Sequence, residues 1–201
     1  MSESNTKPAI VILISGRGSN MVSIVNAVHD GTLPVTVAAI ISNRPDAAGL
    51  DFAKQAGIDT AVIDHKAFES REQFDQILAQ EIDNYSPELV VLAGFMRILT
   101  AEFVEHFAKK LINIHPSLLP KFTGLNTHQR AIDAGEKEHG ASIHFVTAEL
   151  DAGPVILQAR VPVLENDTNV TLAARVLKQE HKLYPDAIKQ LVTGKIASSK
   201  S

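Results

Sequence analysis

Residues 9–20 of the chain read AIVILISGRGSN, an uninterrupted apolar run followed by a turn that contains two glycines. An apolar run of this length is typical of a strand that is buried on both faces of a parallel sheet. A helical pattern follows from about Asn20 to Val28. The segment therefore predicts a strand, a glycine-rich turn and a helix, which together open an α/β fold.

The same alternation continues along the chain. Buried strand patterns and helical patterns follow one another over residues 35–41, 47–56, 60–63, 70–84, 89–93, 100–107 and 111–115. Two longer strand patterns, 141–146 and 155–163, then precede a C-terminal helix that starts at Asp167 or Thr168. We predict a mostly parallel Rossmann-like sheet with helices on both faces and antiparallel additions in the C-terminal half. Pro185 should kink or split the last helix, because proline removes a backbone donor.

Composition narrows the class of protein. The chain has 201 residues, 45% of them hydrophobic and 21% charged, which fits a single globular domain. The net charge of −4 does not favour a nucleic-acid partner, and the absence of cysteine excludes disulfides and cysteine-based metal sites. No apolar run is long enough to cross a membrane, and the polar first seven residues lack a signal-peptide core. We expect a cytoplasmic protein.

The glycine-rich turn suits an anion. Glycines let the backbone approach a ligand closely, and the amides at a helix N-terminus favour negative charge. A phosphate there would meet Ser19 and Asn20, although the same residues could simply cap the helix. A dinucleotide is less favoured, because Met21 stands where the fingerprint requires its third glycine.

A second polar site is predicted at the end of the strand over residues 111–115. Alternation along a strand puts Asn113 and His115 on one face, and Pro116 ends the strand. An amide and a protonated imidazole can both donate to one oxygen, so the pair suits stabilisation of an oxyanion. The alternative is a turn in which His115 only bonds a loop.

Five segments in order and spacing carry a family resemblance: 14–20 (ISGRGSN), 92–99 (LAGFMRIL), 113–120 (NIHPSLLP), 139–146 (HGASIHFV) and 149–156 (ELDAGPVI). They resemble the formyltransferase family that uses 10-formyltetrahydrofolate. The resemblance covers nearly the whole chain. It implies transfer of a formyl group from 10-formyltetrahydrofolate to the amine of 5-phosphoribosylglycinamide in de novo purine biosynthesis.

The resemblance also implies roles for individual residues. Asn113, His115 and Asp151 match the catalytic set. The residues expected to contact the substrate are Arg17, Gly18, Ser19, Asn20, Arg71 and Glu180. The resemblance implies that the folate cleft has two walls. One is formed by Met96, Arg97, Ile98 and Leu99, and the other by Thr147, Ala148, Glu149, Leu150 and Asp151.

Without the resemblance, these residues have plainer interpretations. Asp151 reads as a turn residue, Glu180 and Arg71 as solvated helix charges, and the segment 92–99 as core. A non-catalytic α/β module that binds a phosphate ligand would keep the glycine turn without needing the catalytic set.

The resemblance further implies one domain over residues 1–201. A phosphate-binding half would span about 8–110, and a catalytic and folate-binding half about 111–194. Family members that act on methionyl-tRNA carry an additional C-terminal domain, and those that hydrolyse formyltetrahydrofolate an N-terminal one. The length of the chain therefore favours the phosphoribosylglycinamide reaction.

The histidines and the loop after the fifth strand bear on metal binding and on the shape of the site. His139 and His144 lie five residues apart on a strand and should face opposite ways, and no H-E-x-x-H occurs, so we predict no metal. Ser117 is outside any G-x-S-x-G motif. Thr123 and Asn126 replace the proline and histidine common in the family, which leaves the conformation of the loop 121–128 open. The family pattern predicts a cis Leu119–Pro120 bond. The protein is expected to act as a monomer or homodimer.

Overall fold

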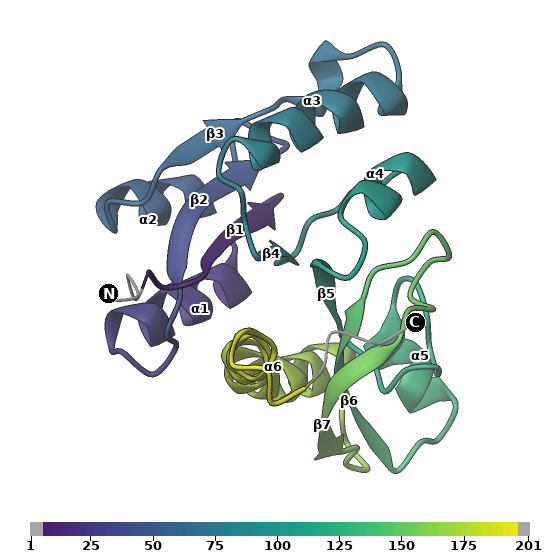
Figure 1. Cartoon of the computed structure of the whole chain (residues 1–201). Coiled ribbons are helices and arrows are strands. Elements are labelled where there is room, and N and C mark those ends of the chain that lie inside the picture. The colour runs from purple at the N-terminus through teal and green to yellow at the C-terminus, as the bar shows by residue number, and fades with distance from the viewer. Residues whose placement is uncertain (1–5, 197–201) are drawn as a thin grey trace.

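The computed structural model describes residues 6–196 and contains one seven-stranded sheet in the order β3-β2-β1-β4-β5-β6-β7 (Figure 1). The strands are β1 (Ala9–Ile14), β2 (Thr36–Ser42), β3 (Thr60–Val62), β4 (Leu89–Leu92), β5 (Leu111–His115), β6 (Glu138–Phe145) and β7 (Val155–Pro162). The helices are α1 (Ser19–His29), α2 (Gly49–Gln55), α3 (Arg71–Asp83), α4 (Ala101–His106), α5 (Thr127–Asp133) and α6 (Asn169–Val192). A short 3-10 turn, η1 (His65–Ala67), follows β3.

Strand direction divides the sheet into two parts. The first five strands pair in parallel, β3 with β2, β2 with β1, β1 with β4 and β4 with β5. The last two strands are antiparallel, since β6 runs against β5 and β7 against β6. The predicted fold class, a mostly parallel sheet with antiparallel additions in the C-terminal half, is confirmed.

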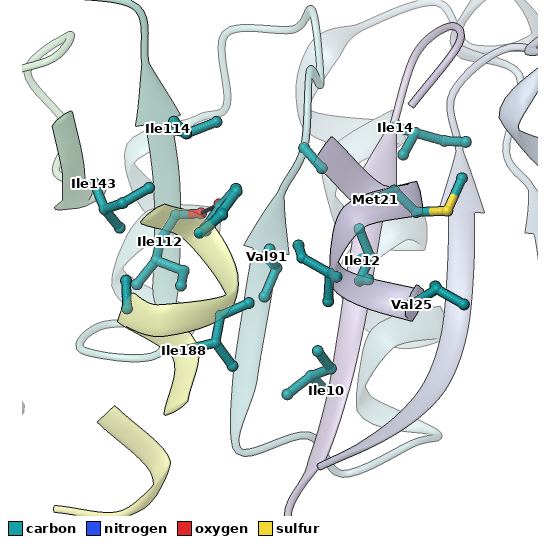
Figure 2. Close-up of a cluster of buried hydrophobic side chains, with 14 of the residues drawn as sticks. Ile10, Ile12, Ile14, Met21, Val25, Val91, Ile112, Ile114, Ile143 and Ile188 are labelled. Atoms are coloured by element: carbon teal, nitrogen blue, oxygen red, sulfur yellow. Dashed lines mark hydrogen bonds between the residues drawn. The ribbon is translucent and has the colours of Figure 1, made fainter. Parts of the chain in front are cut away.

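Helices cover both faces of the sheet and form two apolar cores. On one face α1, α2 and α6 pack over the strands, and Figure 2 shows Ile112 of β5, Ile143 of β6 and Ile188 of α6 gathered in this core. On the other face α3 and α4 pack over β1, β2, β4 and β5 through side chains such as Phe74 and Phe103. Successive residues of β1 alternate between the two cores, as expected of a strand that is buried on both faces.

Helix α6 differs from its prediction in one respect. Thr168 caps it, as expected, in a capping box with Thr171. The helix then runs unbroken through Pro185, so of the two predicted outcomes, a kink or a split, the split is not observed. Tyr184, Ala187 and Ile188 on either side of the proline are fully buried in the core. Their packing stabilises the helical backbone enough to offset the donor that proline lacks.

No helix within residues 6–196 is both long and apolar enough to cross a membrane.

Candidate active site

The sheet places a cavity at its topological switch point. Strand β1 lies between β2 and β4, so the order of the strands reverses at this position, where ligands bind in open α/β sheets. A cavity of about 490 Å³ opens there. It is lined by Ser15, Gly16, Arg17, Gly18, Ser19, Asn20, Asn43, Arg44, His65, Ala93, Gly94, Met96 and Arg97. The structure thus brings all four expected residues of the glycine turn to one cavity.

Gly18 has a conformation that other residues resist. Its φ is +67°, in the left-handed region, and a Cβ added there would lie 2.9 Å from Cε of Met21. Helix α1 begins at the next residue and runs for 11 residues, so its free N-terminal amides face the turn. Close approach of a ligand to this backbone therefore depends on glycine at position 18.

Glu180 is buried rather than solvated. It is 7% exposed, and its Oε2 accepts a hydrogen bond of 2.8 Å from Nδ2 of Asn20. Burial raises the pKa of the Glu180 carboxyl, and the hydrogen bond from Asn20 opposes the rise. Oδ1 of Asn20 is buried and has no hydrogen-bond partner among the described residues. Helix α6 thus delivers an acid to the glycine turn, where it meets the Asn20 amide of α1, although Asn20 and Glu180 are 160 residues apart in sequence.

A buried polar chain links the cavity to the expected folate wall. The Ser15 hydroxyl donates to Oδ1 of Asn43 at 2.6 Å and accepts from the amide of Met96 at 2.7 Å. Nδ1 of His65 lies 2.8 Å from the carbonyl oxygen of Asn43. Sequence reasoning missed Asn43, Arg44 and His65 as lining residues. The signal available was their position just past the ends of β2 and β3, on the edge of the sheet where ligands bind.

The expected folate walls carry exposed apolar side chains. Met96 is 71% exposed, Ile98 61% and Leu150 57%, so these three are not core residues. Leu99 packs partly buried against the core under α3 and α4. Arg97 stacks its guanidinium 5.3 Å from the centre of the Phe74 ring.

The remaining residues of these sets lie at the surface. Thr147, Ala148 and Glu149 are exposed. Arg71 is exposed at the start of α3 and does not line the cavity, so the structure does not bring it to the glycine turn.

His115 and Asp151 meet at the carboxyl end of β5. Nδ1 of His115 lies 3.4 Å from Oδ2 of Asp151, and both side chains are 7% exposed. Asp151 has a φ of +52°, which aspartate tolerates better than most residues. The left-handed turn aims its carboxylate back at β5. Electrostatic interactions between groups this deeply buried are screened far less than those at the surface.

Asn113 joins this cluster through His144, a residue that sequence reasoning considered only as a metal ligand. His144 pairs with Asn113 across β5 and β6, and its Nε2 lies 3.2 Å from Nδ2 of Asn113 and 3.8 Å from Oδ1 of Asp151. Nδ1 of His144 is 2.9 Å from the carbonyl oxygen of Phe145, which can only accept, so this nitrogen carries the proton. Burial lowers the pKa of His144 and keeps the ring neutral, with Nε2 accepting from Asn113.

The cavity does not extend to this cluster as expected. None of Asn113, His115 and Asp151 lines it. The turn after β5 instead folds back over the cluster, beyond a cis Leu119–Pro120 bond that confirms the prediction. Nε2 of His115 is 2.8 Å from the carbonyl oxygen of Phe122, and the amide of Gly124 donates to Oδ2 of Asp151 at 2.8 Å. Backbone of the loop 121–128 therefore covers polar atoms of both His115 and Asp151.

The histidines do not form a metal site together with the acids. Within residues 6–196, no three His, Asp or Glu side chains are grouped as the ligands of a metal ion. His139 instead lies with its Nε2 3.1 Å from Nδ1 of His128, and burial lowers the pKa of His139 to about 4.

Comparison with known proteins identifies the family. The family model described as formyl transferase matches residues 9–188. The chain belongs to the formyl transferase family. It is 54% identical to phosphoribosylglycinamide formyltransferase of Escherichia coli over 187 residues, which are 93% of this chain and 88% of that protein.

Solved structures of formyl transferases agree with this fold. The phosphoribosylglycinamide formyltransferase of Coxiella burnetii superposes with a TM-score of 0.90 at 52% identity, covering 94% of this chain and 88% of that one. Glycinamide ribonucleotide transformylase 1 of Symbiobacterium toebii gives a TM-score of 0.94 at 43% identity, covering 98% and 93%. The similarity thus spans the sheet, both helical layers and the candidate site.

Proposed function

We propose that this chain transfers the formyl group of 10-formyltetrahydrofolate to the amine of 5-phosphoribosylglycinamide in de novo purine biosynthesis. The names of its relatives support this reaction. The observation that carries it is the buried cluster of Asn113, His144, Asp151 and His115 at the end of β5, joined by contacts of 3.2 to 3.8 Å. A module that only binds a phosphate ligand has no need of these four groups together.

The cluster suits attack of an amine on a formyl carbon. The neutral amine adds to the carbon, and the negative charge that develops on the formyl oxygen accepts hydrogen bonds from Nδ2 of Asn113 and from His115. Asp151 stabilises the charged imidazolium of His115 and helps the proton of the attacking nitrogen reach the leaving N10. The C–N10 bond breaks as N10 gains that proton. His144 orients the amide of Asn113.

The remaining expected residues bind the substrates. Gly18, Ser19 and Asn20, with Arg17 beside them, take the phosphate of phosphoribosylglycinamide. Glu180 takes its amino group, and Arg71 serves as a secondary contact for anionic groups. The pterin ring lies between the segments 96–99 and 147–151.

This assignment divides the chain into two halves and defines its partners. Residues from about 8 to 110 bind phosphate, and residues from about 111 to 194 carry the chemistry and the folate, within a single domain. The partners are the two small substrates, with no nucleic acid or membrane. We propose that the protein works in the cytoplasm as a monomer or homodimer.

A direct assay tests the function. Purified protein is mixed with 10-formyltetrahydrofolate and phosphoribosylglycinamide, and the folate absorbance is followed over time. We expect a change that requires both the enzyme and the acceptor. Binding of both compounds without any turnover would instead favour the binding module.

A further inference from the structure

The two side chains at the centre of the proposed chemistry are inaccessible in this conformation. His115 and Asp151 must reach the substrates, yet each side chain is 7% exposed. Besides each other and His144, they touch the carbonyl oxygen of Phe122 and the amide of Gly124. The short segment 122–124, which we call the cap, therefore covers polar atoms of both residues.

The cap occupies the hydrogen-bonding positions that the reaction uses. A carbonyl oxygen only accepts, so the 2.8 Å contact between Nε2 of His115 and the oxygen of Phe122 makes Nε2 the donor. Nδ1 of the same ring faces Asp151. Both nitrogens of His115 are thus engaged, and the Phe122 oxygen takes the donor that would serve the formyl oxygen. The amide of Gly124 likewise occupies Oδ2 of Asp151.

One exposed side chain holds the cap in place. Nη1 of Arg130, on α5, donates to the carbonyl oxygen of Thr123 at 2.6 Å and lies 3.3 Å from that of Leu125. The guanidinium also lies 5.4 Å from the centre of the Phe122 ring. Arg130 therefore contacts both the backbone of the cap and the aromatic ring of Phe122.

The cap needs such a grip because its backbone is unfavourable. Phe122 has a φ of +54° and Gly124 a φ of +75°. A bulky residue in the left-handed region is strained, so contacts elsewhere must stabilise it. Besides Arg130, the Phe122 ring meets the edge of His139 at a centroid distance of 6.1 Å.

We propose that the cap competes with the formyl group for His115, and that Arg130 is the positioning residue that latches the cap. The proposal rests on the proposed function. If the capped state dominates the free enzyme, the apparent affinity for the formyl donor is reduced by the fraction of uncapped molecules. Removing the latch should raise that fraction without changing the chemical step.

The test begins with accessibility, which needs no turnover. Diethyl pyrocarbonate acylates exposed imidazoles, and peptide mass spectrometry reads the modification of His115 separately from the other histidines. We expect His115 in Arg130→Met to react at least about 3-fold faster than in the wild type, because one exposed cation–π contact and a charge-assisted hydrogen bond are lost. Arg130→Lys keeps the charge but loses the planar guanidinium. Its His115 should therefore react at a rate between those of the wild type and Arg130→Met.

A matched control lies one residue earlier on the same helix. Gln129 is exposed and bonds only Asp133, at 2.8 Å, among the side-chain contacts of the described residues. Gln129→Met makes a comparable change of surface without touching the cap. Its His115 should react at the wild-type rate.

Kinetics supply the second measurement. Arg130→Met should lower the KM for 10-formyltetrahydrofolate about 3- to 10-fold with kcat within about 2-fold of the wild type. An unchanged rate of His115 modification in a folded Arg130→Met protein would overturn the proposal, and so would a fall in kcat with KM unchanged or raised. If the wild type transfers no formyl group but the modification rates differ as expected, the proposed function is wrong, while the proposal that Arg130 latches the cap is supported.

Discussion

The glycine-turn end and the catalytic end of the site differ in how open they are. The first is a cavity of about 490 Å³ that is rimmed by Arg17, Arg44 and Arg97. The second is a dry cluster in which His115 and Asp151 are each 7% exposed. An open, positively charged cavity captures a phosphate from water, whereas electrostatic stabilisation of a transition state is strongest where water is excluded. Under the proposed function, recognition and chemistry thus occupy environments of opposite character.

The catalytic end should show the largest effect of mutation. His115→Ala should lower kcat by at least about 100-fold, as should Asn113→Ala and Asp151→Asn, because each removes a group that stabilises the developing charge or its partner. The folate absorbance assay measures the loss, and circular dichroism checks the fold. A suitable control is His106→Ala, since this exposed histidine on α4 bonds Asp83 at 2.8 Å and packs edge-on against the Phe107 ring, away from the site. Full activity in folded His115→Ala would contradict the mechanism.

Mutation at the glycine-turn end should change KM rather than kcat. Gly18→Val places a β-branched side chain at a φ of +67° and against Met21, so the backbone can no longer approach the phosphate. We expect the KM for phosphoribosylglycinamide to rise at least about 10-fold, with the KM for folate far less affected.

Gly31→Val separates backbone strain from lost binding. Gly31 also has a left-handed φ, +79°, but no atom lies within 4 Å of an added Cβ and the residue is not in the site. This variant should lose stability while keeping both KM values. Equal rises in both KM values for Gly18→Val would indicate general misfolding.

His144 tests how far the dry cluster acts as a unit. His144→Phe fills the same space but leaves Nδ2 of Asn113 without its acceptor at 3.2 Å. The loss of one orienting hydrogen bond should lower kcat by about 10-fold. His144→Gln retains an acceptor and should recover part of that loss. Wild-type kcat in His144→Phe would show that Asn113 is oriented by other contacts.

The sequence predicted the fold class, and the position of Asn113 and His115 at a strand end, because both follow from local patterns. Apolar runs and strand alternation place Asn113 and His115 at a strand end, and the carboxyl ends of strands are where ligands bind. His144 was missed as a member of the cluster, because its place opposite Asn113 depends on the antiparallel register of β5 and β6. The cap was missed for a similar reason, since no local pattern predicts a phenylalanine with a φ of +54°.

Tertiary packing explains the two other differences. A glutamate on a helix is usually solvated, but α6 packs across the sheet and buries Glu180 against Asn20. Pro185 does not split the helix because its buried neighbours outweigh the local preference. In both cases, contacts between distant segments override what neighbouring residues favour.

The smallest expected effect concerns stability and lies where the open cavity meets the buried interior. Burial raises the pKa of Glu180, so the folded state holds a proton that the unfolded state releases. This group therefore contributes stability below its ordinary pKa, which is lost as the pH rises through the raised value. Glu180→Gln keeps an oxygen acceptor for Asn20 and removes the titration. We expect it to be more stable than the wild type at pH 8, by about 1 kcal/mol or ~2–4 °C in Tm, and to show no such gain at pH 4.

The exposed Glu105 on α4 supplies the control, because Glu105→Gln should leave the difference in Tm between pH 4 and pH 8 unchanged. The KM for the acceptor provides a second measurement. If Glu180 holds the amino group of the acceptor, Glu180→Gln should raise the KM for phosphoribosylglycinamide at the same pH at which it raises Tm. A functional site commonly retains a group that destabilises the fold, and the opposite signs of the two changes would identify Glu180 as such a group. A variant that is no more stable at pH 8 would show that the carboxyl is solvated, and one with unchanged KM that its burial is purely structural.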